Sequence, residues 1–216
     1  MTSKWKPAMN HYLDTKTGRT LKKRPPAHMI DSVFDNQYFI NLRESLRKLR
    51  EEEVVRYDIE LGRLGIREYE FGDANPLKKS HEMLLSVAQK VFSPTAIPSY
   101  SLYVTYRGFR ANLPYHVDDN ACTYTIDLCL SQGTPWPIVI EGSPFILGEN
   151  QAVCYYGEDQ YHGREQFPDP SSNEVEMIFY HFIEPNHWYT TNGSEYINKI
   201  VSDRLEHERR NRELSA

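Results

Sequence analysis

The sequence predicts an α+β protein whose core is an antiparallel jelly roll. Two observations support this fold class. In the first third of the chain, apolar residues recur at the three- and four-residue spacings of amphipathic helices. From about residue 98 onward they alternate with a period of two. The later segments are short, β-branched and aromatic, and Gly, Pro and Asn separate them, which is typical of an antiparallel sandwich or barrel.

Two helices are expected before the strands. An amphipathic pattern predicts one helix over residues 36–53 and a second over 76–92, where Pro76 occupies the first turn. The segment between them, residues 54–71, is mixed and fits either a strand or a loop.

Five extended segments follow, at residues 99–106, 123–130, 137–142, 151–156 and 174–183. In the second of them, alternation separates two faces. One face carries Tyr124, Ile126, Leu128 and Leu130, and the other carries Thr123, Thr125, Asp127 and Cys129.

The chain therefore divides into four expected parts. These are a basic N-terminal arm over 1–30, a helical cap of the same domain over 31–97, a jelly-roll catalytic core over 98–190 and a C-terminal helix over 191–216. The arm is expected to be solvated. The C-terminal helix carries one apolar stripe, so it is expected to pack on the domain or on a twin subunit, which makes a homodimer compatible with the sequence.

Composition and charge narrow the classes of function. The net charge of −5 supplies no global basic field, so nucleic acid is not an expected partner. No run of about 18 apolar residues is present, so no membrane span is expected. The N-terminus lacks the apolar stretch of a signal peptide, and a cytoplasmic location is expected. Three Cys without a C-x-x-C spacing argue against a disulfide scaffold or a zinc knuckle.

The residues that suggest chemistry begin at an H-x-D pair. His116 and Asp118 are two positions apart in an extended segment, so their side chains leave the same face and can bind one divalent metal. His162, at the end of a later strand, is the expected third ligand. Two imidazoles and one carboxylate form the facial triad of non-heme Fe(II) oxygenases. His181 is a rival third ligand, although it is expected to pack in the core.

The order of these segments resembles the 2-oxoglutarate/Fe(II)-dependent dioxygenases, particularly their prolyl-hydroxylase-like branch. Tyr106 and Gly108 lead into the H-x-D pair, a Gly-containing turn at 148–150 precedes the distal His162, and a Phe-rich strand closes the series. The resemblance covers about residues 98–184. It implies a double-stranded β-helix, Fe(II) and 2-oxoglutarate as cofactor and cosubstrate, and hydroxylation of an unactivated C–H bond with release of succinate and CO2.

The cosubstrate site departs from the family pattern. In many members a basic residue for the far carboxylate of 2-oxoglutarate follows the distal His, but residues 168–176 here hold no Lys or Arg. Arg164 is the nearest candidate, about 7 Å from His162 on the same face of an extended chain, and its guanidinium can bind a carboxylate bidentately. Tyr106 is expected to add a hydrogen bond. Arg107 and Arg110 are alternatives.

The expected substrate is a small molecule such as an amino acid or a derivative. Asp119, Arg107 and Trp188 are the expected substrate contacts. Two other classes stay open at this point. One is a cupin-like metal enzyme with isomerase or hydrolase chemistry, although the H-x-H pair of that family is absent. The other is a non-catalytic jelly-roll binding module with a basic arm.

Overall fold

The computed structural model describes residues 20–52, 56–58, 63–67, 75–119, 121–168, 174–193 and 195. Apart from residues 191–193 and 195, the expected C-terminal helix lies outside the described residues, as do residues 1–19 of the expected arm.

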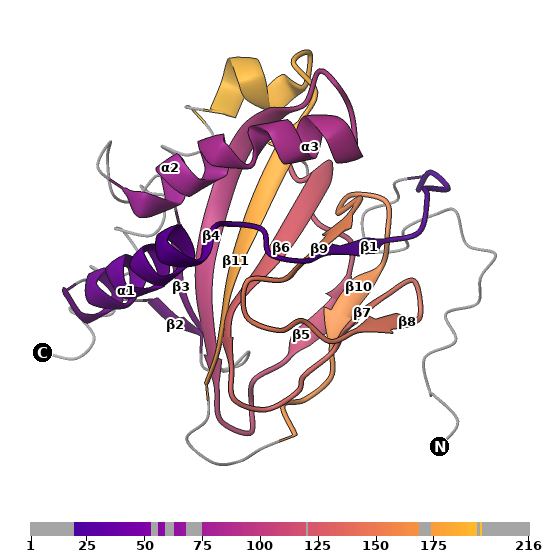
Figure 1. The fold of residues 1–216 in the computed structure, drawn as a ribbon. Coiled ribbons are helices and arrows are strands. Elements are labelled where there is room, and N and C mark those ends of the chain that lie inside the picture. The colour runs from indigo at the N-terminus through magenta and orange to yellow at the C-terminus, as the bar shows by residue number, and fades with distance from the viewer. Residues whose placement is uncertain are drawn as a thin grey trace, which may run out of the picture.

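Two antiparallel sheets form the core (Figure 1). The larger has the order β1-β9-β6-β11-β4-β3-β2 and the smaller the order β5-β10-β7-β8. The bounds of the larger sheet are β1 His28–Ile30, β9 Ala152–Tyr155, β6 Tyr124–Gln132, β11 Glu174–Ile183, β4 Ile97–Arg107, β3 Arg63–Arg67 and β2 Arg56–Asp58. Those of the smaller sheet are β5 Leu113–His116, β10 His162–Arg164, β7 Ile138–Ile140 and β8 Ser143–Phe145. The predicted α+β fold with a double-stranded β-helix core is confirmed. The described residues of the mixed segment after the first helix form the strands β2 and β3.

Three helices cover the larger sheet on the side away from the smaller one (Figure 1): α1 Asn36–Glu52, α2 Pro76–Met83 and α3 Leu85–Val91. The helix expected over 76–92 is thus two helices that meet at Leu84, whose N–H reaches the carbonyls of both Ser80 and His81. The start of α2 follows from its N-cap, because the Asn75 side chain accepts a hydrogen bond from the Leu77 N–H at 2.8 Å.

The alternation predicted for β6 sorts its residues between two apolar clusters. Tyr124, Ile126, Leu128 and Leu130 pack beneath the helices, where Leu46 of α1 is fully buried. Cys129 faces the other way, into the space between the sheets. Burial of each large side chain stabilises the fold by about 1.5–3 kcal/mol. The central strands therefore pack against the helices on one face and against the smaller sheet on the other. The face toward the smaller sheet, the inner face, is the one available for a site.

Part of the expected basic arm packs against the sheet. Residues 28–30 pair with β9 as its edge strand. Arg24 donates to Asp159 at 2.7 Å, and its guanidinium lies 4.6 Å from the centre of the Tyr156 ring. Residues 20–30 therefore belong to the folded domain, where the sequence predicted a solvated segment.

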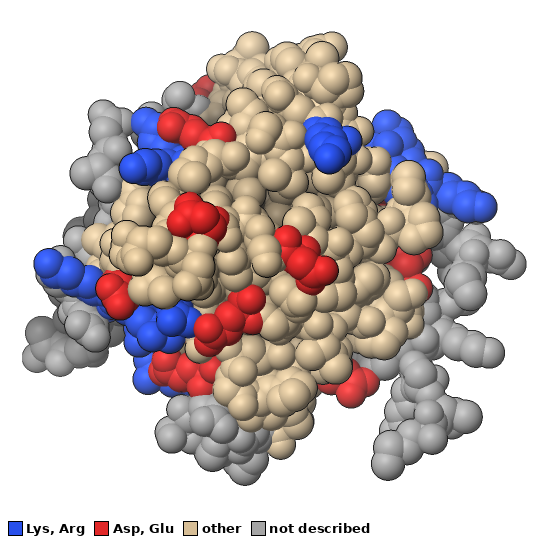
Figure 2. Space-filling view, in the orientation of Figure 1, with Lys and Arg blue, Asp and Glu red and all other residues tan. Residues whose placement is uncertain are grey.

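The outer face of the larger sheet carries a buried ion-pair network beneath α1. Glu176 is 2% exposed and accepts hydrogen bonds from Arg47 and from the Tyr103 hydroxyl, the latter at 2.6 Å. On the face shown in Figure 2, acidic and basic side chains lie side by side rather than as one basic surface. No described helix is long and apolar enough to cross a membrane.

This network is expected to make stability depend on pH. Burial by itself raises the pKa of Glu176, but the hydrogen bonds from Arg47 and Tyr103 outweigh it and hold the pKa below its ordinary value. A carboxyl whose pKa is depressed on folding stabilises the fold at pH values above its ordinary pKa of about 4.3. That contribution is lost as the pH falls through the folded-state pKa.

Thermal melts between about pH 7 and 3 should show Glu176→Gln to be less stable than wild type at neutral pH, with a shallower loss of stability on acidification. Glu149→Gln, which removes an exposed pair with Arg43, should change stability by about 0–1 kcal/mol. Equal pH slopes for Glu176→Gln and wild type would contradict this account.

Candidate metal centre

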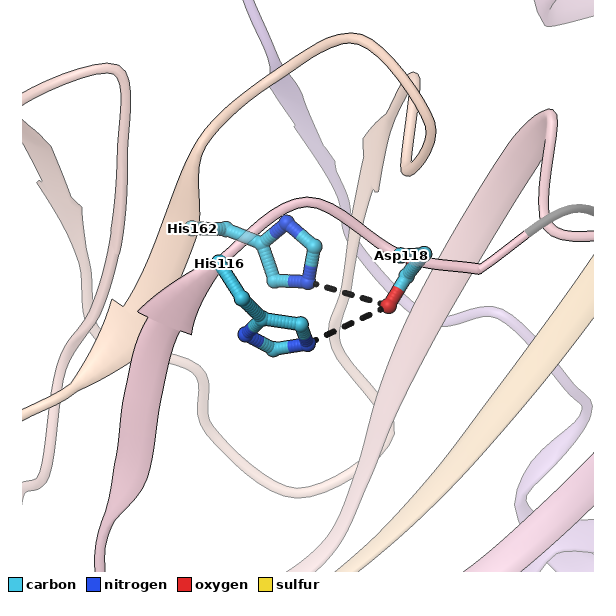
Figure 3. Close-up of side chains that lie close together, drawn as sticks. All are labelled: His116, Asp118 and His162. Carbon is cyan, nitrogen blue, oxygen red and sulfur yellow. Dashed lines mark ion pairs between the residues drawn. The ribbon is translucent and has the colours of Figure 1, made fainter. Parts of the chain in front are cut away.

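Strand register brings the two predicted histidine ligands together. His116 at the end of β5 and His162 at the start of β10 are paired residues of neighbouring antiparallel strands. Their ring centroids lie 4.5 Å apart. Paired residues have side chains on the same face of the sheet, so both imidazoles point toward the inner face of the barrel (Figure 3).

Backbone carbonyls determine which nitrogen of each ring can bind a metal. His116 Nδ1 lies 2.6 Å from the carbonyl of Pro114, and His162 Nδ1 lies 2.9 Å from that of Gln160. A carbonyl can only accept, so both Nδ1 atoms carry the proton. In the neutral rings this leaves the Nε2 lone pairs directed into the site, as in metal-bound histidines.

Asp118 completes the cluster from the segment after β5. Its Oδ1 lies 3.4 Å from Nε2 of both His116 and His162 (Figure 3). Its backbone N–H donates to the Gly157 carbonyl at 2.8 Å, which fixes the segment against the end of β9. Ligand atoms bonded to one metal at about 2.1 Å lie about 3.0–3.4 Å apart at angles of 90–109°. The observed spacing therefore fits a metal ion.

The other carboxylate oxygen of Asp118 is held from β6. The Thr125 hydroxyl donates to Oδ2 at 3.2 Å. Gly157 permits this approach, since a Cβ there would lie 2.2 Å from Oδ2 and 2.5 Å from the Thr125 hydroxyl. The carboxylate is thus oriented by a hydroxyl on one side and by the absence of a side chain on the other.

The charges of the cluster are mutually dependent. Burial by itself raises the pKa of Asp118, but the charge of His162 and hydrogen bonds from both imidazoles hold it well below its ordinary range. Burial lowers the pKa of His162, and the nearby Asp118 carboxylate more than compensates and raises it. A carboxylate that stays ionised beside two histidines suits a divalent cation.

Access to the centre is one-sided. The His162 side chain is 2% exposed, whereas that of His116 is 32% exposed. The side of the cluster that is open to solvent is therefore the side of His116.

The rival ligand His181 lies on the other side of Asp118. Asp118, Cys122 and His181 form a second group with ligand atoms within 4.8 Å of one another, as do His116, Asp118 and His162. His181 Nδ1 is 3.2 Å from the Thr125 hydroxyl, and burial lowers its pKa to about 4. Cys122 Sγ lies 3.2 Å from the Tyr100 hydroxyl. Only the first group directs two imidazoles at one carboxylate oxygen.

The predicted cosubstrate residues are buried between the sheets. Tyr106 is fully buried, and its ring packs against Trp136 with centroids 5.1 Å apart. Arg164 is 3% exposed, donates through Nη1 to the Trp136 carbonyl, and has its guanidinium carbon 5.0 Å from the centre of the Trp136 ring. Burial lowers the pKa of Arg164. Its Nε has no hydrogen-bond partner among the described residues.

The other predicted contacts are placed differently. Arg107 follows Tyr106 in β4, so it lies on the opposite face, where its Nε is 3.5 Å from Glu174. The structure therefore does not bring Arg107 to the site. Asp119 is exposed and directly follows Asp118. Trp188 packs with Tyr189 in a small cluster next to Ala121.

Sequence reasoning missed two residues that shape the site, Thr125 and Gly157, and it gave no role to Asp127, which is buried between the sheets. The alternation in β6 placed Thr125 and Asp127 on the face opposite the apolar residues, and a carboxyl on the inner face of a central strand was the available signal. Nothing in the sequence marked Gly157, because its role is to leave space for a side chain from another segment.

Comparison with known proteins identifies the fold. No family profile and no curated sequence matches the chain. Among solved structures, a prolyl-4-hydroxylase from Pseudomonas putida is 12% identical, with a TM-score of 0.55 over 72% of this chain and 91% of that one. HygX from Streptomyces hygroscopicus, solved with nickel, 2-oxoglutarate and hygromycin B, is 10% identical, with a TM-score of 0.58 over 74% and 83%. The α-ketoglutarate-dependent epimerase SnoN from nogalamycin biosynthesis is 9% identical, with a TM-score of 0.60 over 73% and 77%. The fold is therefore shared with 2-oxoglutarate-dependent enzymes, as the sequence resemblance implied.

Proposed function

We propose that the chain is a non-heme Fe(II)- and 2-oxoglutarate-dependent oxygenase. One observation carries the proposal: Nε2 of His116 and Nε2 of His162 both lie 3.4 Å from the same oxygen of Asp118. Two imidazoles and a carboxylate on one face leave further coordination positions for a cosubstrate and O2. The shared fold is consistent with this reading but does not by itself assign an activity.

The residues of the site divide the work of the proposed reaction between metal binding and cosubstrate binding. His116, Asp118 and His162 hold the metal, and the carbonyls of Pro114 and Gln160 keep the imidazoles oriented. Arg164 binds the far carboxylate of 2-oxoglutarate, and Tyr106 contacts the cosubstrate beside it. When bound, Fe(II) and 2-oxoglutarate supply the activation of O2 and the oxidation of a C–H bond, with succinate and CO2 as coproducts.

The proposed substrate is a small molecule, and hydroxylation is the proposed outcome. Solved structures of this fold include an epimerase and a hydroxylase, so the outcome is determined by how the substrate is held. Asp119 and Trp188 remain the proposed contacts, and an amine-bearing molecule such as an amino acid derivative would suit the carboxylate of Asp119. Two histidines and one aspartate, without an H-x-H pair, do not favour a cupin-like centre. A non-catalytic binding module would give no reason for two imidazoles to point at one carboxylate oxygen.

The proposal is tested by adding Fe(II) and 2-oxoglutarate to the metal-free protein without O2. A visible charge-transfer band that needs both additions is expected, because it reports chelation of the 2-oxo acid to iron. Metal binding without the band would contradict the cosubstrate assignment, and no metal binding would contradict the enzyme assignment.

Arg164→Ala is expected to weaken 2-oxoglutarate binding by at least about 30-fold, since it removes a buried charged partner of the far carboxylate. Metal affinity without 2-oxoglutarate should stay close to wild type. Arg164→Lys should recover only part of the loss, because an ammonium lacks the planar bidentate geometry. Unchanged 2-oxoglutarate affinity in Arg164→Ala would show that another residue binds the cosubstrate.

A further inference from the structure

Asp127 is a buried carboxyl that the proposed reaction does not yet use. It lies in the middle of β6, on the strand face that points between the sheets, and it is 1% exposed. The Tyr155 hydroxyl donates to its Oδ2 at 3.2 Å. Its Oδ1 is buried and has no hydrogen-bond partner among the described residues. A buried polar atom without a partner is costly, so a strand centre rarely retains one without a ligand to fill it.

Arg164 supplies the complementary group on β10. Its Nη1 and Nη2 are directed at the Trp136 carbonyl and at Met177 Sδ, the latter at 3.7 Å. Its Nε lacks a partner within the part of the chain that the structure describes. Met177 of β11 pairs with Cys129, which lies two residues from Asp127 on the same face of β6, so Arg164 and Asp127 lie in the same interior region. Among the described residues, the region therefore holds one donor nitrogen, Arg164 Nε, and one acceptor oxygen, Asp127 Oδ1, that have no partner at all.

Arg164 Nε and Asp127 Oδ1 define which end group of a ligand could form a hydrogen bond with each of them. A carboxylate accepts from Arg164 but has no proton to donate to Asp127. A primary amide or a protonated carboxyl has both a carbonyl oxygen and a hydrogen-bond donor. The pair therefore suits a ligand end group that accepts from Nε and donates to Oδ1.

We propose that Asp127 is a specificity-determining residue, which together with Arg164 binds the far end group of the 2-oxo acid and admits its amide as well as its carboxylate. The inference rests on the proposed function and adds a ligand class, the 5-amide of 2-oxoglutarate. For 2-oxoglutarate itself, one proton is shared between its far carboxyl and Asp127. Burial raises the pKa of Asp127 to about 7, so such a proton is available near neutral pH.

The test compares the affinities of 2-oxoglutarate and its 5-amide, measured by calorimetry on the nickel-loaded protein. Asp127→Asn places an N–H opposite the far carboxylate and removes the like charge, so it should bind 2-oxoglutarate more tightly. Asp127→Leu removes the acceptor that the amide requires. In both variants the preference for 2-oxoglutarate over the amide should rise by at least about 10-fold relative to wild type.

Glu44→Gln is the matched control, because it makes the same carboxyl-to-amide change at an exposed position of α1, and its preference should equal that of wild type. If both Asp127 variants keep the wild-type preference within about twofold, the inference is wrong while the proposed function stands. If the wild-type protein binds neither ligand, the proposed function itself fails. Asp127→Asn is nearly isosteric, so it carries the test should Asp127→Leu not fold.

Discussion

Replacing His162 by alanine is expected to weaken metal binding by at least about 100-fold and to abolish turnover. Loss of a residue that only orients a metal ligand costs about 10–100-fold in affinity, and His162 is proposed as a ligand itself. Its Nε2 is directed at Asp118 by the Gln160 carbonyl, and its ring is buried against Tyr155 with centroids 4.6 Å apart. Removal therefore takes away a donor that the surrounding residues cannot replace. Titration of the metal-free protein with Fe(II) or Co(II) in the absence of O2 measures the effect.

Two further variants separate loss of a ligand from loss of the fold. His116→Ala should weaken binding to a similar extent, and its side chain is 32% exposed, so little packing is lost. His28→Ala removes an exposed imidazole from β1 and should leave metal affinity unchanged. His181→Asn decides between the two possible ligand groups. If His181→Asn loses the metal while His162→Ala retains it, the ion is bound by the group around Cys122, and the triad assignment is wrong.

Replacing Gly157 by alanine is expected to weaken metal binding by about 10–100-fold without touching a ligand. The added Cβ would lie 2.2 Å from Asp118 Oδ2 and 2.6 Å from the Cys122 carbonyl, distances that real Cβ atoms do not tolerate. Asp118 must therefore move by about 1 Å, and a displacement of this size at a functional group costs about 100-fold. Overpacking should also destabilise the fold by about 1–3 kcal/mol. Metal titration and thermal melts measure the two effects separately.

Gly65→Ala is the control for this variant. A Cβ at Gly65 would meet the Leu102 side chain at 3.6 Å, which is an ordinary contact, so metal affinity should not change. A Gly157→Ala protein that binds metal as tightly as wild type would show that Asp118 does not need its present position.

The sequence by itself determined most of the helices and strands, and it named the residues of the proposed metal centre. Alternation is a local property, so residues 123–130 were sorted correctly into an outer apolar face and an inner polar face. The H-x-D pair placed His116 and Asp118 on one face for the same reason. The position of Arg164 two residues after His162 likewise made both inward-facing, as both are buried.

Only the tertiary structure decided how these segments meet. The pairing of His162 with His116 depends on the register between β10 and β5, which residues distant in the chain determine together. Arg107 was expected near the substrate, but it faces Glu174, because alternation after the buried Tyr106 directs it outward. Distances between strands decide how closely Gly157 approaches Asp118, and they leave one atom each of Asp127 and Arg164 without a partner among the described residues. Such distances depend on packing across the whole domain, and a local pattern of residues does not encode them.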